Sequence, residues 1–208
     1  MNNLLQNFVL YTTQIIQVLV FVAGCYFFGI SIFGWIKRKD DKPGEYPPNK
    51  RFALVIAAHN EELVIGNVID SLLNQNYPGE LYDIFIVADN CTDRTASIAL
   101  QHGAIVYERF DAEKRGKGHA LEWMFRKLYK MDGKYDVISV FDADNLVSSN
   151  YLEEMNKQLC KGHKVVQGYI DSKNPFDSWI TCSYSIAFWL SNRLFQLPRH
   201  YLGLCCGL

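Results

Sequence analysis

The sequence has no segment with the excess of positive charge that binding to nucleic acid requires. Its 21 Lys and Arg residues are offset by 22 Asp and Glu residues, so the formal net charge is −1. Proteins that bind a phosphate backbone carry clustered cations on one face. We therefore expect no nucleic acid partner.

The cysteines lack the spacing of a metal site. No Cys-x-x-Cys pair and no zinc-like spacing of Cys and His occurs. We expect reduced, structural thiols rather than disulfides. The six cysteines are Cys25, Cys91, Cys160, Cys182, Cys205 and Cys206.

Charged residues are also missing from Val9 to Trp35. A helix of this length crosses the ~30 Å hydrocarbon layer of a bilayer. The alternative is a buried core helix. A cleaved signal peptide is disfavoured, because no Lys or Arg precedes the run. We expect a membrane anchor in residues 1–39, with its span at about 9–35.

The cations that follow this run predict its orientation. Lys37-Arg38-Lys39 comes directly after the uncharged segment, and the positive-inside bias places such a cluster in the cytoplasm. We expect a single-pass protein of the cell membrane, with the N-terminus outside and the soluble domain cytoplasmic. Residues 40–50, which contain three prolines and a glycine, read as a linker.

The rest of the chain, residues 51–208, alternates between strand-like and helix-like patterns. This alternation predicts an α/β fold with a mostly parallel sheet covered by helices on both faces. The expected strands are Phe52–Ala58, Tyr82–Ala88, Ala104–Glu108, Asp136–Phe141 and Lys164–Tyr169. The expected helices are Glu62–Asn74, Asp93–His102, Gly118–Tyr129 and Asn150–Cys160.

Polar clusters follow three of these strands at their carboxyl ends. They are His59-Asn-Glu-Glu62, Asp89-Asn-Cys-Thr-Asp93 and Asp142-Ala-Asp144. Ligands of open α/β sheets bind at this edge. Asp142 and Asp144, one residue apart, predict a site for Mg²⁺ or Mn²⁺ that leaves room for a diphosphate. Helix capping and simple turns are the alternative explanation.

The loop Lys114-Arg-Gly-Lys-Gly-His119 has three cations and two glycines before an expected helix. Glycines let backbone approach a phosphate, and a helix N-terminus with Lys117 favours an anion. The loop is not a Walker A motif, because Gly118 follows the lysine where Ser or Thr would be needed. A solvated surface loop is the alternative.

Four motifs in this order resemble the family 2 glycosyltransferases, the GT-A-fold group that includes cellulose, hyaluronan and poly-N-acetylglucosamine synthases. They are Val55-Ile-Ala-Ala-His-Asn-Glu-Glu62, Ile86-Val-Ala-Asp-Asn-Cys-Thr-Asp-Arg-Thr95, Arg115-Gly-Lys-Gly-His-Ala-Leu121 and Phe141-Asp-Ala-Asp144.

The resemblance implies a nucleotide-sugar donor, most often a UDP-sugar, and a glycan or lipid acceptor. It implies that Ala58, His59, Glu61 and Asp89 meet the nucleoside and that Lys117 lies near the pyrophosphate. It also implies Asp142 near ribose and phosphate and Asp144 on the metal.

Parts of the family pattern have no counterpart before Leu208. The synthase-like members have a further acidic motif that supplies the general base, a Gln-x-x-Arg-Trp motif and C-terminal membrane helices. We expect a chain truncated within the domain, with its catalytic base unknown. An apolar segment, Trp179–Leu197, is expected as a helix at the membrane interface or over the sheet.

Other functions fit parts of the pattern. The chain could be a catalytically incomplete remnant that only binds a nucleotide sugar. A sugar nucleotidyltransferase would share the sheet and the metal carboxylates but would need a Gly-rich loop where His59 stands. An Asp-nucleophile phosphatase would have its Asp-x-Asp on the first strand.

Overall fold

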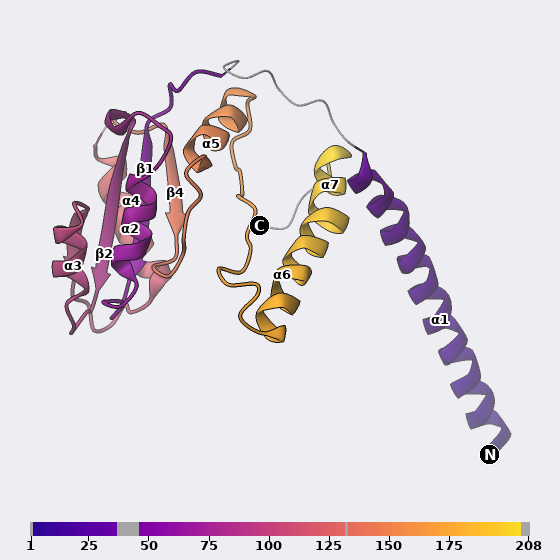
Figure 1. Ribbon diagram of the computed structural model, residues 1–208. Helices are drawn as coiled ribbons and strands as arrows, with labels where there is room; N and C mark the ends of the chain where they lie inside the picture. The colour runs from indigo at the N-terminus through magenta and orange to yellow at the C-terminus, as the bar shows by residue number, and fades with distance from the viewer. Residues whose placement is uncertain (1, 37–45, 132, 205–208) are drawn as a thin grey trace. The chain divides into compact units, whose positions relative to one another are not determined.

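The computed structural model describes residues 2–36, 46–131 and 133–204 (Figure 1). The chain divides into two units, Lys42–Gly168 and the two terminal segments Met1–Asp41 and Tyr169–Leu208. Lys37-Arg38-Lys39 and most of the expected linker lie outside the described residues.

Residues 42–168 are built around a four-stranded parallel sheet. The strands are β1 (Phe52–Ala58), β2 (Tyr82–Asp89), β3 (Ile105–Arg109) and β4 (Val137–Phe141). They lie in the order β3-β2-β1-β4, and every pair is parallel. The chain adds β2 and β3 on one side of β1 and β4 on the other, so strand order reverses next to β1. Ligands of such sheets bind beside that reversal, at the carboxyl ends.

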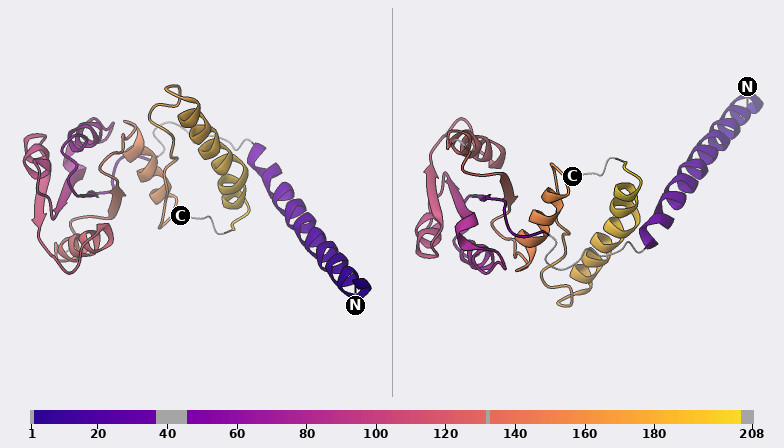
Figure 2. Two further views of the ribbon diagram at one scale, coloured as in Figure 1. Left: turned by 90° about the horizontal axis from the view of Figure 1, so that it is seen from below. Right: turned by 90° about the horizontal axis from the view of Figure 1, so that it is seen from above.

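Helices cover both faces of the sheet, as Figure 2 shows. They are α2 (Ile65–Leu73), α3 (Thr95–Gln101), α4 (Lys117–Tyr129) and α5 (Tyr151–Cys160). Successive residues of a strand point to opposite faces, so Leu54 and Ile56 pack with α2, α3 and α5, whereas Ala53 and Val55 pack with α4. The expected α/β fold with a parallel sheet between helices is confirmed.

Strand β1 is the centre of this core. The side chains from Phe52 to Ile56 are fully buried, which explains why the segment reads as a continuous apolar run without alternation. Burying one large apolar side chain contributes about 1.5–3 kcal/mol. This burial holds the end of β1 firmly in place beneath the polar residues that follow it.

One expected strand is wrong. Residues 164–169 form no strand, and no strand pairs with them within the described parts of the chain. The segment runs along α5 instead. A Cβ built on Gly168 would lie 3.2 Å from the ring of Tyr151, and Val166 packs on the core while Val165 is 70% exposed. Because this apolar segment packs beside a helix, it has no neighbouring strand with which its backbone could form the hydrogen bonds of a sheet.

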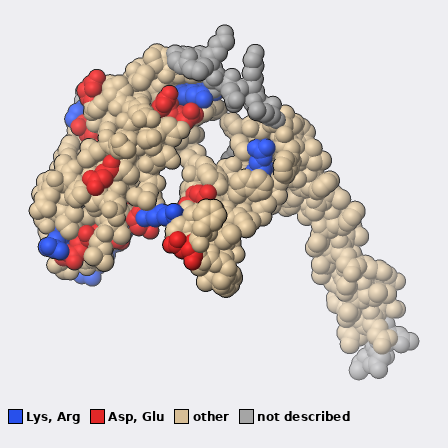
Figure 3. Space-filling view, in the orientation of Figure 1, with Lys and Arg blue, Asp and Glu red and all other residues tan. Residues whose placement is uncertain are grey.

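The terminal unit contains α1 (Asn2–Ile32) and the 3-10 turn η1 (Phe33–Trp35), then α6 (Trp179–Ser191), the π-helical η3 (Asn192–Gln196) and α7 (Leu197–Tyr201). Within Leu4–Trp35, an 18-residue window has a mean hydropathy of 2.3, and almost all of this window is exposed. Figure 3 shows no charged side chain along the described part of α1. The helical segment Leu4–Trp35 is long and apolar enough to cross a membrane, and it includes residues 9–35, where the span is expected.

The C-terminal helices pack against the end of α1. The rings of Phe27 and Phe195 lie 5.8 Å apart, and those of Trp35 and Trp189 lie 6.4 Å apart. Gly34 allows this approach, because a Cβ there would be 2.1 Å from the carbonyl oxygen of Arg193. The helical conformation expected for Trp179–Leu197 is confirmed, whereas its place at the membrane interface or over the sheet stays a prediction.

Candidate functional site

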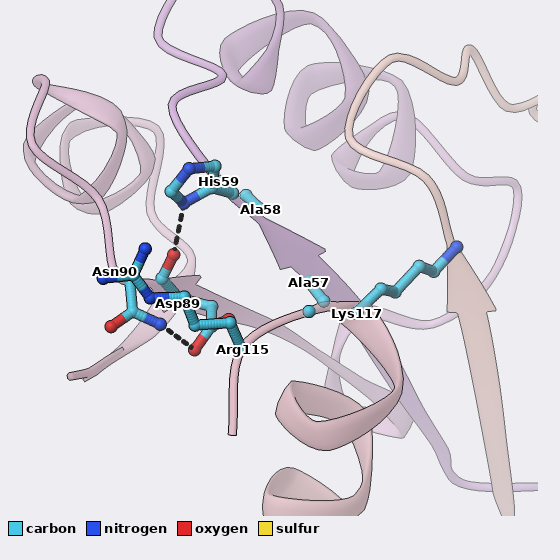
Figure 4. A pocket seen from close by; sticks show the side chains of 8 residues that line it. Ala57, Ala58, His59, Asp89, Asn90, Arg115 and Lys117 are labelled. Carbon is cyan, nitrogen blue, oxygen red and sulfur yellow. Dashed lines mark hydrogen bonds between the residues drawn. The ribbon is translucent and has the colours of Figure 1, made fainter. Parts of the chain in front are cut away.

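A cavity of about 300 Å³ opens at the carboxyl edge of the sheet, where β1 and β2 end and α4 begins (Figure 4). Its volume is at the lower end of the range for small-molecule sites. The residues that line it are Ala57, Ala58, His59, Asp89, Asn90, Arg115, Gly116 and Lys117. Ala58, His59, Asp89 and Lys117, which the sequence singled out, therefore share one cavity.

The turns after β1 and β2 are bound to each other. His59 Nδ1 donates to the backbone oxygen of Asp89 at 2.7 Å (Figure 4). Asn60, in the left-handed region with φ 57°, accepts the N–H of Thr92 on its side-chain oxygen at 2.8 Å. These contacts keep the His59 ring beside the cavity without using its Nε2 atom.

Glu61 belongs to the same turn but does not line the cavity. Its backbone N–H donates to Thr95 Oγ1 at 2.8 Å, and the next N–H, that of Glu62, donates to Asp93 at 3.1 Å. Burial opposes ionisation of Asp93, yet the hydrogen bonds from Thr95 and Glu62 outweigh it and lower the pKa of this carboxyl. Asp93 thus joins the turn after β1 to the start of α3.

Asp89 ends β2 as a buried carboxylate. Only 5% of the residue is exposed, and its Oδ1 forms an ion pair with Arg109, which is 6% exposed. Asn90 Nδ2 also donates to this oxygen at 3.1 Å. Burial of an ion pair is costly unless hydrogen bonds satisfy its remaining atoms. Both contacts are made by Oδ1, and no buried side-chain nitrogen or oxygen of the described residues lacks a hydrogen-bond partner. Asp89 is therefore a carboxylate held in a fixed position at the cavity wall.

Lys117 begins α4 and extends toward the end of β4 (Figure 4). Its ammonium forms an ion pair with Asp142, and both side chains are about half exposed. The structure therefore brings a cation and a carboxylate together from segments 25 residues apart. Both belong to the set that the sequence motifs predicted.

Asp142 and Asp144 lie in the turn after β4. Both are described by the structure, and Ala143 between them is buried with 6% exposure while Asp142 is exposed. Asn145 Oδ1 accepts the backbone N–H of Asp142 at 3.1 Å and holds this turn. The described residues contain no cluster of three or more His, Cys, Asp or Glu side chains that could enclose a metal.

These two carboxylates fit a hard divalent cation that keeps open positions. Mg²⁺ and Mn²⁺ prefer oxygen ligands, and Mg²⁺ is commonly held by one or two carboxylates together with substrate phosphates. With Ala143 turned into the core, the flanking Asp142 and Asp144 lie on the outer side of the turn. Asp142 already has Lys117 as a partner, so a cation would share this carboxylate with the lysine.

Sequence reasoning missed several residues of the site. Asn90, Arg115 and Gly116 line the cavity, and all three stand inside the glycosyltransferase-like motifs, although the motifs gave them no role. Arg109 was missed for another reason. Nothing around it in the sequence marks it, and only its position at the end of a strand could have drawn attention to it.

The family assignment rests on a match that covers most of the chain. The family model described as "Glycosyltransferase like family 2" matches residues 47–206. The chain belongs to this family.

Two curated relatives each match about half of this chain. The "Beta-monoglucosyldiacylglycerol synthase" of Synechocystis sp. is 34% identical over 111 residues, 52% of this chain and 22% of the relative. The "Probable glycosyltransferase YdaM" of Bacillus subtilis is 33% identical over 105 residues, 46% of this chain and 23% of the relative. The chain thus matches less than a quarter of each relative's length.

Solved structures support the fold. The mannosyltransferase PcManGT from Pyrobaculum calidifontis, in complex with GDP-Man and Mn²⁺, superposes with a TM-score of 0.55 at 21% identity. The match covers 76% of this chain and 45% of PcManGT. This agreement confirms the GT-A arrangement of strands and helices.

Proposed function

We propose that the chain is a membrane-anchored glycosyltransferase that moves a sugar from a nucleotide sugar to a glycan or lipid acceptor. The observation that carries the proposal is the convergence of Asp89, Lys117 and Asp142 at one sheet edge. Fold alone would not support a function. Here family membership agrees with a site that has a fixed anion, a helix-terminal lysine and a pair of carboxylates.

The nucleoside would occupy the side of the cavity formed by Ala58, His59 and Asp89, with Glu61 in the adjoining turn. A buried carboxylate accepts hydrogen bonds only, so Asp89 suits a base that presents an N–H, as both uracil and guanine do. We favour a UDP-sugar as the donor because the family resemblance most often implies one. PcManGT was solved with GDP-Man, so GDP is the comparison ligand.

The diphosphate would lie between the start of α4 and the turn after β4. Lys117 and the backbone N–H groups at the start of α4 would bind its oxygens, with Asp142 near ribose and phosphate. Asp144, together with Asp142, would hold Mg²⁺ or Mn²⁺, and a bound cation stabilises negative charge on a departing diphosphate. The Mn²⁺ in the PcManGT complex is in keeping with this choice.

Transfer would proceed by one displacement at the anomeric carbon, with inversion. The acceptor hydroxyl needs a positioned general base, and we assign no residue of this chain to that role. A lipid acceptor is supported by the name of the Synechocystis relative and by that of a second relative, the "4,4'-diaponeurosporenoate glycosyltransferase" of Staphylococcus aureus. The apolar helix α1 supports action at a membrane.

Calorimetry on the full chain in detergent tests donor binding. UDP should bind in the presence of Mn²⁺, GDP should bind more weakly, and Asp89→Asn should weaken UDP binding by about tenfold or more, since truncating a buried charge pair is costly. Asp70→Asn, a matched change on α2 outside the site, should bind UDP as the wild type does. Equal binding of UDP by Asp89→Asn would contradict the assignment.

Turnover needs a separate assay. Radiolabelled UDP-sugars are incubated with the chain, Mn²⁺ and a membrane lipid extract, and labelled lipid is counted after extraction. Labelled product that depends on Asp144 would support transfer to lipid. UDP binding without any labelled product from lipid or glycan acceptors would reduce the function of this chain to donor binding.

A further inference from the structure

Arg109 contacts Asp89, a residue of the cavity wall, although Arg109 itself does not line the cavity. It ends β3, is 6% exposed, and directs its guanidinium to three acceptors. Nη1 pairs with Asp89, whereas Nη2 donates to Asp111 Oδ2 at 3.0 Å and to the backbone oxygen of Lys114 at 2.7 Å. One side chain thus contacts both the end of β2 and the loop that leads to α4.

Asn90 closes the same junction from the other strand. Its backbone N–H donates to the backbone oxygen of Arg109 at 2.7 Å, and its side-chain oxygen accepts the N–H of Asp111 at 2.9 Å. Asn90 adopts the left-handed backbone with φ 52°, a conformation that Asn tolerates well among non-glycine residues. The ends of β2 and β3 are therefore tied together by side chains and backbone.

The loop after β3 is itself ordered by these contacts. Asp111 Oδ1 accepts the N–H groups of Glu113 at 3.0 Å and Lys114 at 2.8 Å. The N–H of Lys114, followed by that of Glu113 and the charge of Arg109, lowers the pKa of Asp111. This carboxylate therefore stays ionised at neutral pH. Arg115, the next residue after Lys114, lines the cavity.

We propose that Arg109 is a positioning residue that sets the Asp89 carboxylate and the loop that carries Arg115 and leads to Lys117 in one fixed geometry. The inference rests on the proposed function, because Asp89 serves the nucleoside there and Lys117 the diphosphate. Arg109 touches neither part of the donor. It determines the spacing between the groups that do.

Arginine suits this role and lysine does not. The planar guanidinium offers five N–H donors in a rigid fork, so it can serve Asp89, Asp111 and a backbone oxygen at once. An ammonium is a compact point charge on a flexible stem. Arg109→Lys would keep the positive charge near Asp89 but lose the simultaneous contacts to the loop.

The decisive variant is therefore Arg109→Lys, with Arg109→Met as the charge-removing form. Both are prepared as full chains in detergent and compared with Tyr77→Phe, a buried control that loses hydrogen bonds to the Lys50 backbone and to Asn156. Uridine and UDP with Mn²⁺ are titrated by calorimetry. Hydrogen exchange of backbone amides is followed over residues 111–117 and over β1.

Arg109→Lys should bind uridine and UDP about 10- to 100-fold more weakly, by analogy with the loss seen when a hydrogen-bonding partner that orients a metal ligand is removed. Exchange should rise in residues 111–117 and stay slow in β1. Tyr77→Phe, even with a lower unfolding temperature, should keep both affinities within about twofold of the wild type. If Arg109→Met does not fold, the Arg109→Lys variant decides.

Two results would overturn the inference. One is wild-type affinity in Arg109→Lys, and the other is an equal loss in Tyr77→Phe, which would trace the effect to stability alone. A wild-type chain that binds neither uridine nor UDP would overturn the proposed function instead. In that case hydrogen exchange of the backbone amides in residues 111–117 tests the positioning role of Arg109. An unchanged exchange rate in Arg109→Lys would exclude this role.

Discussion

Lys117, the first residue of α4, forms an ion pair with Asp142, the first residue after β4. The lysine that we assign to the diphosphate therefore contacts a carboxylate that we assign to the metal. A cation bound at Asp142 would share this carboxylate with the Lys117 ammonium and so compete with it. Binding of the metal and release of Lys117 toward the phosphates would then be linked.

This competition predicts effects of opposite sign for Lys117→Met. UDP binding should weaken, because the diphosphate loses a cation. Mn²⁺ binding without nucleotide should strengthen by about two- to fivefold, the value of one exposed ion pair. Calorimetry measures the first effect, and electron paramagnetic resonance of free Mn²⁺ measures the second.

Lys130→Met is the matched control, since Lys130 follows α4 and is exposed at its other end. It should change neither affinity. Unaltered Mn²⁺ binding in Lys117→Met would show that the ion pair does not restrict access to Asp142.

Asp144→Asn tests the metal assignment directly. The change removes one negative charge from the metal site and keeps the shape of the side chain, so the fold should be unaffected. UDP affinity in Mn²⁺ should fall about tenfold or more, whereas UDP affinity in chelator should equal that of the wild type. The same titration on the wild type with and without chelator must show metal dependence; equal affinities would remove the metal from the proposal.

The pKa of Asp93 predicts how stability depends on pH. Burial opposes ionisation, but hydrogen bonds from Thr95 and Glu62 outweigh it and lower this pKa in the folded chain. The contribution of Asp93 to stability is therefore present above the unfolded pKa of about 3.9. It is lost as pH falls through the lower, folded value. Asp93→Ala should reduce the free energy of unfolding by about 0.5–2 kcal/mol at pH 7, the usual cost of losing a helix-start acceptor.

Thermal unfolding in detergent at pH 7, 5 and 3 measures the difference. The gap between wild type and Asp93→Ala should be the same at pH 7 and 5 and should shrink at pH 3. Glu113→Ala, on the exposed loop, is the control. A gap that widened on acidification would mean that Asp93 is stabilising in its protonated form.

The parts of the fold that local pattern determines were predictable. The buried strand β1 reads as an apolar run because both its faces are covered, and the polar residues after it mark the carboxyl edge. The site residues His59, Asp89, Lys117 and Asp142 follow from this rule together with the family motifs. Their grouping around the strand-order reversal needed no knowledge of side-chain contacts.

The parts that depend on distant partners were not predictable. Arg109 acquires its role only when β2, β3 and the loop meet. Asn156 on α5 behaves similarly. It is fully buried and donates to the backbone oxygens of Tyr46 and Pro47, more than 100 residues earlier in the chain. The wrong strand at residues 164–169 has the same origin, because a strand exists only where a neighbour offers its backbone.

The charge pattern around α1 predicts the topology of the whole chain. No charged residue precedes Lys37-Arg38-Lys39, and these cations should remain in the cytoplasm. A reporter that works only in the cytoplasm should therefore be active when fused after residue 45, and one that works only outside the cell should be inactive. A protease added outside intact cells should leave residues 51–204 uncut. Replacing the three cations by Gln should weaken this preference, whereas the same change at Lys127, Lys130 and Lys134 should not. Cleavage of the wild-type domain from outside would show that the orientation is the opposite one. The proposed site would then have no access to cytosolic nucleotide sugars.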